Sequence, residues 1–249
     1  MDEILTMNNV TAGYQSTTVL EQITIGLRAN TVTALLGRNG AGKTTLLSTI
    51  MGFTRVESGA VLFNGDDITL LPTHLRAKHG IALVPQEREI FPSLTVEENL
   101  RVARARRSEW TIAGVYELFP RLAERKENYG NQLSGGEQQM LAIGRALVSG
   151  PSLLLLDEPF EGLAPVIVDS LVSALNAIRH SSRISMILVE HHVDLALSMS
   201  DYVLILDKGS IIARGLSEEF RDGEKVASMI GLRELSSDVN VGQLGHSTL

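Results

Sequence analysis

The chain has 249 residues, of which 44% are hydrophobic and 20% are charged, and this is enough apolar material for one globular domain with a large core. It contains no cysteine, which excludes disulfides and thiolate metal sites and favours a reducing compartment. The formal net charge is −7, whereas proteins that bind nucleic acids normally carry a basic excess, so no nucleic-acid partner is expected.

The N-terminal region shows the alternating apolar pattern of strands. Segments 4–10 and 19–27 predict two antiparallel strands, and a third strand with an Asn-Gly hairpin signal follows in 58–65. Tyr14 lies in the loop between the first two strands. A tyrosine at this place packs as a turn aromatic or lays its ring on a purine, and the residues alone leave both roles open.

A glycine-rich loop lies between an apolar run at 31–36, which predicts a strand, and an apolar-patterned segment at 46–51, which predicts a helix. Strand, glycine loop and helix in this order are typical of a phosphate-binding P-loop, because backbone N–H groups turn toward an anion and the helix adds its N-terminal donors. Lys43 is expected to reach the β and γ phosphates, and the Thr44 hydroxyl to bind the accompanying Mg²⁺. The whole loop comprises Gly37, Arg38, Asn39, Gly40, Ala41, Gly42, Lys43, Thr44 and Thr45.

Gln86 directly follows a predicted strand at 81–85, which ends at a proline. This is where α/β sheets place ligand-binding groups, but it is also where an ordinary surface loop begins. The position alone does not decide between the two interpretations.

From about 91 to 150 the strand signals disappear and helical signals replace them, which predicts a helical lobe inserted between strands. A capping box at 95–98 begins a helix that is expected to run to about Arg107. The four arginines of this helix, between 101 and 107, are expected to form a solvated face. A second helix is expected to end at Pro120. The apolar face of this second helix consists of Ile112, Val115, Tyr116 and Phe119.

The last helix of the lobe begins at Ser134, which is followed by Gly135 and Gly136. Ser134 and Glu137 have the spacing of a capping box, so the segment is explained as a well-formed helix start. Two glycines beside free N–H donors also favour a second anion site. The residues support both interpretations equally.

An apolar run at 153–156 predicts a strand buried on both faces, and Asp157 and Glu158 stand at its carboxyl end, where the phosphates are expected. Asp157 is expected to hold Mg²⁺ through water, and Glu158 to orient or deprotonate the attacking water. The alternative is a carboxylate pair that caps the next helix, which begins at Pro165. A further buried strand at 184–189 ends beside His191 and His192. Histidines at this place are structural hydrogen-bonding groups, or one of the pair senses the γ-phosphate.

Together these motifs resemble the ATP-binding subunit of ABC transporters, from about Ile4 to Gly231. The segment 133–139, with the sequence Leu-Ser-Gly-Gly-Glu-Gln-Gln, is similar to the ABC signature and lies between a P-loop and an apolar strand ending in Asp-Glu. The resemblance implies that Tyr14 stacks on adenine, that Gln86 lies in the lid near Mg²⁺, and that His191 is the switch histidine. It further implies that the γ-phosphate of the ATP held by a second subunit is gripped by Ser134, Gly135 and Gly136.

The implied fold is α/β: a P-loop NTPase core of the ABC ATPase type with a mostly parallel sheet, an N-terminal antiparallel β subdomain and the inserted helical lobe. The ABC-type domain is expected over 1–235, followed by a mobile tail at 236–249. Within the family, segments 84–92 and 160–165 look most like the subunits of importers for branched-chain amino acids and the related urea or amide importers. Ala164-Pro165 departs from the pattern, since many relatives carry an acidic residue there. The departure leaves the details of signalling across the dimer open and the hydrolytic residues intact.

The resemblance implies ATP and Mg²⁺ as cofactors, a head-to-tail dimer with an identical or paralogous ATPase subunit, transmembrane permease subunits and, indirectly, a solute-binding protein. The resemblance also implies a cytoplasmic location, peripheral on the inner face of the membrane. The sequence agrees with this expectation, since no apolar run approaches the ~20 residues of a membrane span and the N-terminus lacks a signal peptide's basic start. The alternatives are a soluble ABC ATPase that is not coupled to transport, and a nucleotide-binding regulator without turnover.

Overall fold

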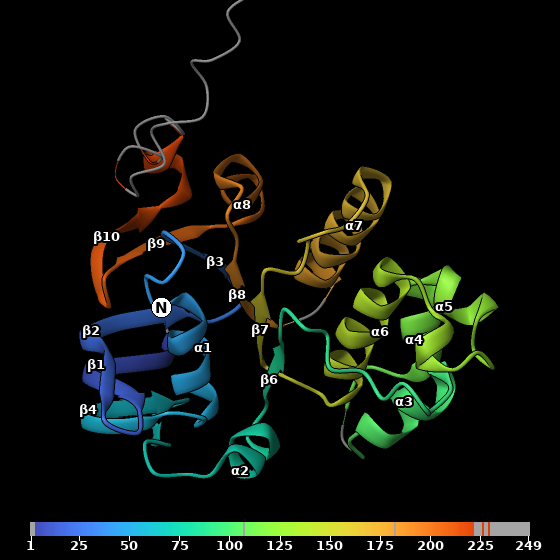
Figure 1. Cartoon of the computed structure of the whole chain (residues 1–249), viewed down its shortest axis with the longest axis horizontal. Helices are drawn as coiled ribbons and strands as arrows, with labels where there is room; N and C mark the ends of the chain where they lie inside the picture. Colours follow the sequence, from blue (N-terminus) through green and yellow to red (C-terminus); the bar gives the residue numbers. More distant parts are fainter. Residues whose placement is uncertain (1–2, 107, 182, 222–225, 227–228, 230–249) are drawn as a thin grey trace, which may run out of the picture.

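The computed structural model describes residues 3–106, 108–181 and 183–221, together with 226 and 229 (Figure 1). Most of the domain expected over 1–235 lies within these residues, whereas the tail at 236–249 lies outside them. Among the described helices, none combines the length and the apolar character needed to span a bilayer.

The N-terminal region forms a four-stranded antiparallel sheet in the order β2-β1-β4-β5. The hairpin between β4 and β5 has Asn64 at φ 51° and Gly65 at φ 85°, the left-handed conformations that an Asn-Gly turn supplies, and this confirms the predicted hairpin. The strands are β1 (Glu3–Tyr14), β2 (Thr17–Arg28), β4 (Arg55–Phe63) and β5 (Asp66–Asp67).

The second sheet has six strands in the order β10-β9-β3-β8-β7-β6, and only the β9–β10 pair is antiparallel. The mostly parallel sheet predicted from the family resemblance is therefore confirmed. Every residue of β3, β7 and β8 is buried, as expected for central strands covered on both faces. The strands are β3 (Val32–Leu36), β6 (Ile81–Val84), β7 (Leu153–Asp157), β8 (Ser185–Val189), β9 (Tyr202–Asp207) and β10 (Ser210–Leu216).

The inserted lobe lies on the right of Figure 1, on the side of β6 away from the antiparallel sheet. It contains α3 (Val96–Ala103), α4 (Ile112–Leu118), α5 (Pro120–Glu124), the short 3-10 helix η1 (Gly130–Gln132) and α6 (Gly135–Val148). The remaining helical elements are α1 (Lys43–Met51), α2 (Thr73–Lys78), α7 (Pro165–Ser181), α8 (Val193–Met199) and the 3-10 helix η2 (Ser217–Phe220).

Two details of the lobe differ from the sequence prediction. The helix expected to reach Arg107 ends at Ala103, because the chain turns away so that the Ala105 N–H donates to the Val148 carbonyl at 3.0 Å. Pro120 follows the end of α4 as predicted, but it also opens α5, where the missing N–H of a proline costs nothing at the first helical position.

The central strand β7 contributes alternate residues to two separate apolar cores. Leu154 and Leu156 pack with the lobe and α7, whereas Leu153 and Leu155 pack with α1 and the antiparallel sheet. Because both faces of β7 are covered, its carboxyl end is held firmly at one edge of the sheet. Asp157 and Glu158 emerge at that edge.

Candidate functional site

A cavity of about 460 Å³ lies at the carboxyl ends of the parallel strands. It brings together the P-loop and groups from three separate strand ends, as the sequence predicts for an α/β sheet. Its lining residues are Val19, Asn39, Gly40, Gly42, Lys43, Thr44, Thr45, Gln86, Glu158, Glu161 and His191. A larger cavity of about 720 Å³ is lined by Thr31, Asp201 and other residues at the opposite edge, and it contains none of the predicted site residues.

The P-loop is closely packed against the sheet. A side chain at Gly37 would place its Cβ 2.3 Å from the Leu206 carbonyl oxygen, so only glycine fits there. Gly42 is the N-cap of α1 at φ 107°, again a conformation that favours glycine. The Lys43 ammonium donates to the carbonyls of Gly37 and Arg38 at 3.0 and 3.3 Å, which curls its side chain back over the loop.

The opposite end of α1 is held by Arg76, which sequence reasoning missed. Only 2% of Arg76 is exposed, and its guanidinium donates to the carbonyls of Thr49 (2.7 Å) and Ile50 (2.9 Å) in the last turn of α1, as well as to Leu71 and Thr69. A buried cation at a helix C-terminus satisfies free carbonyls and complements the helix dipole. Arg76 thus fixes the helix whose N-terminus carries the P-loop.

Lys43 and Asp157 are deeply buried charged groups of the site, with 5% and 3% of each residue exposed. Burial lowers the pKa of Lys43, although nearby carboxylates, Glu158 foremost, oppose this shift. Burial raises the pKa of Asp157, and a hydrogen bond with the Thr44 side chain opposes that change. The Asp157 Oδ1 atom is buried without a hydrogen-bond partner among the described residues.

Glu158 lies at the centre of the cavity's charged groups. Its Oε1 atom is 2.7 Å from His191 Nε2 and 4.0 Å from the Lys43 ammonium. Burial, together with a hydrogen bond to the Glu161 side chain, raises the pKa of Glu158 to about 7. Burial lowers the pKa of His191, and the nearby charge of Lys43 acts in the same direction.

Two further carboxylates belong to the site, and sequence reasoning assigned them no role. Glu161 accepts a hydrogen bond from the Gln86 side-chain amide at the cavity wall. Glu190 is buried, with 3% of the residue exposed. Its Oε2 atom accepts a hydrogen bond from the His191 N–H at 3.1 Å, which fixes the backbone that carries this histidine. The available signal was positional, because both residues follow the same strand ends as Glu158 and His191.

The structure does not bring all predicted site residues to this cavity. Tyr14 is the last residue of β1, is 43% exposed and does not line the cavity. Ser134 caps α6 through a complete capping box with Glu137, and Gly135 and Gly136 form the first turn of that helix in the lobe. These three residues likewise do not line the cavity.

The polar groups fit a magnesium ion that is bound together with phosphate. The unpartnered Oδ1 atom of Asp157 lies beside Thr44, and hard oxygen donors of this kind suit Mg²⁺. No cluster of three or more His, Cys, Asp or Glu side chains that could hold a metal occurs among the described residues. An ion here would therefore depend on phosphate oxygens for much of its coordination, as is usual for Mg²⁺ in nucleotide sites.

A P-loop on a parallel sheet, with an acidic pair at the end of a neighbouring strand, defines a P-loop nucleoside triphosphatase. Residues 20–161 match the family described as ABC transporter. The chain belongs to this family, as an ATP-binding ATPase subunit that works with transmembrane partners.

Several curated relatives are similar over almost their full length. The chain is 38% identical over 213 residues to the high-affinity branched-chain amino acid transport ATP-binding protein BraG of Pseudomonas aeruginosa, covering 84% of this chain and 91% of the relative. It is 38% identical to the probable branched-chain amino acid transport protein LivF of Archaeoglobus fulgidus (86% and 92% covered). It is 36% identical to the lipopolysaccharide export ATP-binding protein LptB of Haemophilus influenzae (90% and 95% covered).

The fold is also that of solved ATP-binding cassettes. A nucleotide-free cassette from an ABC transporter superposes with a TM-score of 0.78 at 24% identity, covering 94% of this chain and all of that chain. A cassette in its ADP conformation gives a TM-score of 0.77 at 26% identity with the same coverage. The predicted ABC ATPase fold is thereby confirmed.

Proposed function

We propose that the chain is the ATPase subunit of an importer for branched-chain amino acids or a related small polar solute. The observation that carries this proposal is the 38% identity to BraG over 91% of that relative, matched by LivF. The second candidate is a subunit for lipopolysaccharide export, because the identity to LptB of H. influenzae is 36% over a similar span.

In the proposed reaction, water attacks the γ-phosphorus of ATP, its proton passes to Glu158, and the bond to the oxygen bridging the β and γ phosphates breaks. The 2.7 Å contact with His191 orients the Glu158 carboxylate, and the nearby Lys43 ammonium binds the phosphates. Gln86 faces the same cavity and is released from Glu161 when it turns toward the phosphates.

Mg²⁺ is proposed to be held by the Thr44 hydroxyl, by Asp157 through water and by Gln86. Its chemistry would be to neutralise the developing charge on the phosphate oxygens. The buried, unpartnered Oδ1 atom of Asp157 supports this assignment.

The remaining roles require a second subunit. Ser134, Gly135 and Gly136 lie in the lobe and do not line the cavity, which fits a head-to-tail dimer in which they grip the ATP bound by a partner. The partner is an identical chain or a paralogue. Tyr14, half exposed at the end of β1, is proposed to stack on the adenine.

The proposed assembly has the dimer on permease subunits at the inner face of the membrane, with a solute-binding protein acting on the far side. The permease is proposed to bind the helical lobe. ATP-driven closure of the dimer would then change the conformation of the permease, and hydrolysis would reset it.

The catalytic assignment is tested with two variants of the purified protein. Glu158→Gln removes the proton acceptor and leaves the P-loop intact, so we expect unchanged ATP affinity and a loss of phosphate release of at least about 100-fold. Lys43→Ala should instead weaken ATP binding in a titration. Wild-type turnover by Glu158→Gln would remove Glu158 from the role of base, and unchanged affinity of Lys43→Ala would contradict the P-loop assignment.

The solute is tested by uptake of radiolabelled leucine in cells that lack this subunit. We expect uptake to be lost, to return with the wild-type chain and not to return with Glu158→Gln. Normal leucine uptake combined with a defect of lipopolysaccharide at the cell surface would favour the export function instead.

A further inference from the structure

Arg88 stands two residues after Gln86, in a segment with unusual backbone geometry. Arg88 has φ 64° and Glu89 has φ 45°, so two consecutive residues that are not glycine adopt the left-handed conformation. Such residues are uncommon, and each carries an energetic cost that other contacts must offset. The turn is closed by the Arg88 N–H, which donates to the Pro85 carbonyl at 2.9 Å.

This backbone directs the Arg88 side chain onto the start of α6. A Cβ atom at Gly135 would lie 3.1 Å from Arg88 Nη1 and 3.5 Å from Cζ, so the glycine leaves the space that the guanidinium fills. The Arg88 Nε atom is buried, and no described residue forms a hydrogen bond with it. Among the described residues, no carboxylate forms an ion pair with this guanidinium.

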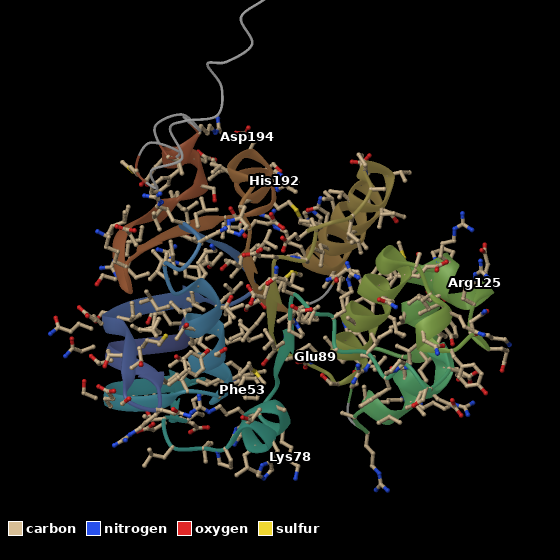
Figure 2. The ribbon with its side chains drawn as sticks, viewed as in Figure 1. Phe53, Lys78, Glu89, Arg125, His192 and Asp194 are labelled. Atoms are coloured by element: carbon tan, nitrogen blue, oxygen red, sulfur yellow. The ribbon has the colours of Figure 1, made fainter. Side chains whose placement is uncertain are left out.

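A second arginine keeps the segment in place. Arg145, on α6, donates to the Glu89 carbonyl at 2.6 Å and lies over the Phe91 ring at 4.4 Å from its centre. Figure 2 shows Glu89 between the sheet and the lobe, where it accepts this hydrogen bond from Arg145. Residues 88–91 are therefore fixed to the helix that begins with Gly135.

A half-buried guanidinium without a counter-ion is poorly placed at a helix N-terminus, because the helix dipole presents positive charge there. Its position becomes favourable when an anion binds both the guanidinium and the free N–H groups of the glycine turn. On the proposed dimer, the anion that meets this end of α6 is the terminal phosphate of the ATP bound by the partner.

We propose that Arg88 is a further nucleotide-binding residue, which contacts the γ-phosphate of the ATP held by the partner's P-loop. This inference rests on the head-to-tail dimer proposed above.

The test measures ATP-driven dimer formation by light scattering, in a Glu158→Gln background that prevents turnover. Arg88→Ala should raise the ATP concentration needed for half-dimerisation by about tenfold or more, the loss expected for a charge-assisted hydrogen bond. Arg88→Lys, which keeps the charge, should recover part of this loss. The matched control is Arg121→Ala, an exposed arginine of the lobe that pairs with Glu124, and it should dimerise like the parent.

The second readout is ATP affinity at protein concentrations too low for dimerisation. Arg88→Ala should bind ATP like the parent there, because its own cavity is intact, whereas a general folding defect would weaken both readouts and lower Tm. Normal dimerisation of Arg88→Ala would overturn the inference while leaving the proposed dimer intact. An equal loss of dimerisation in Arg88→Lys and Arg88→Ala would have the same meaning. A parent that binds ATP and never dimerises refutes the dimer, and the inference with it.

Discussion

At the scale of single residues, the chemistry of the cavity depends on how Glu158 is held. Its backbone is left-handed at φ 49°, and its N–H donates to the Val189 carbonyl at 3.0 Å, so the turn after β7 is tied to β8. This geometry presents the carboxylate to His191 and Lys43. Strain of this kind is tolerated where the surroundings fix the conformation, as they do beside two buried strands.

The raised pKa of Glu158 predicts a pH dependence of stability. The folded protein binds the proton more tightly than the unfolded chain, whose pKa is near the ordinary 4.5, so the stabilising contribution is complete below that value and is lost as pH rises through about 7. Glu158→Gln removes this loss. Between about pH 5 and pH 8, the Tm of the nucleotide-free variant should fall less than that of the wild type by about 2–4 °C.

Thermal unfolding followed by circular dichroism measures this difference. Glu117→Gln, the same substitution at an exposed position of α4 outside the cavity, serves as the control and should keep the wild-type slope of Tm against pH in this range. Parallel curves for the wild type and Glu158→Gln would show that Glu158 titrates normally.

The sequence identified most of the cavity residues at this scale because they follow recognisable motifs. Glu158 and Lys43 could be predicted from the P-loop and the apolar strand ending in two carboxylates. The contact between Gln86 and Glu161 could not, since it joins two loops 75 positions apart and depends on the order of β6 and β7 in the sheet.

At the scale of elements, the P-loop is only as rigid as α1, and α1 is anchored at its far end by Arg76. Arg76 packs closely against the end of α1, because a Cβ atom at Gly52, the C-cap of α1, would lie 2.8 Å from Arg76 Nε. The Gly52 cap itself could be predicted from the sequence. The buried arginine could not, because its partners are backbone carbonyls that have no sequence signal.

Replacing Arg76 by leucine should strongly destabilise the protein. The substitution leaves several buried carbonyls without donors, at a cost of about 1–3 kcal/mol for each unsatisfied group, so we expect a loss of roughly 3 kcal/mol or more. The corresponding fall in Tm is about 6–12 °C. Lys78→Ala, at an exposed position of the same helix α2 (Figure 2), is the control and should unfold like the wild type. Equal Tm values for all three proteins would contradict the anchoring role.

Element boundaries were predictable where they depend on local chemistry. The capping boxes at Thr95 and Ser134 place the starts of α3 and α6 correctly. The end of α3 was predicted four residues too late, because it is set by the distant Ala105–Val148 hydrogen bond. Helices α2 and α8 were missed, since six and seven residues are too few to show a clear helical period.

At the scale of the whole molecule, the antiparallel sheet and the lobe stand on opposite sides of the strands that carry the cavity (Figure 1). The cavity contains the groups proposed for binding and proton transfer, while the glycine turn at the start of α6 does not line it. Composition and periodicity did not predict this division. It followed only from the resemblance to the family, because the second half of each site is proposed to belong to another chain.

The central claim is that one chain holds half of an ATPase site and that two chains complete it. The most direct test is the rate of phosphate release per chain, measured at saturating ATP over a wide range of protein concentration. The composite site predicts a rate per chain that is low in dilute protein and rises to a plateau as dimers form. A rate per chain that stays constant down to concentrations at which light scattering shows only monomers would contradict it.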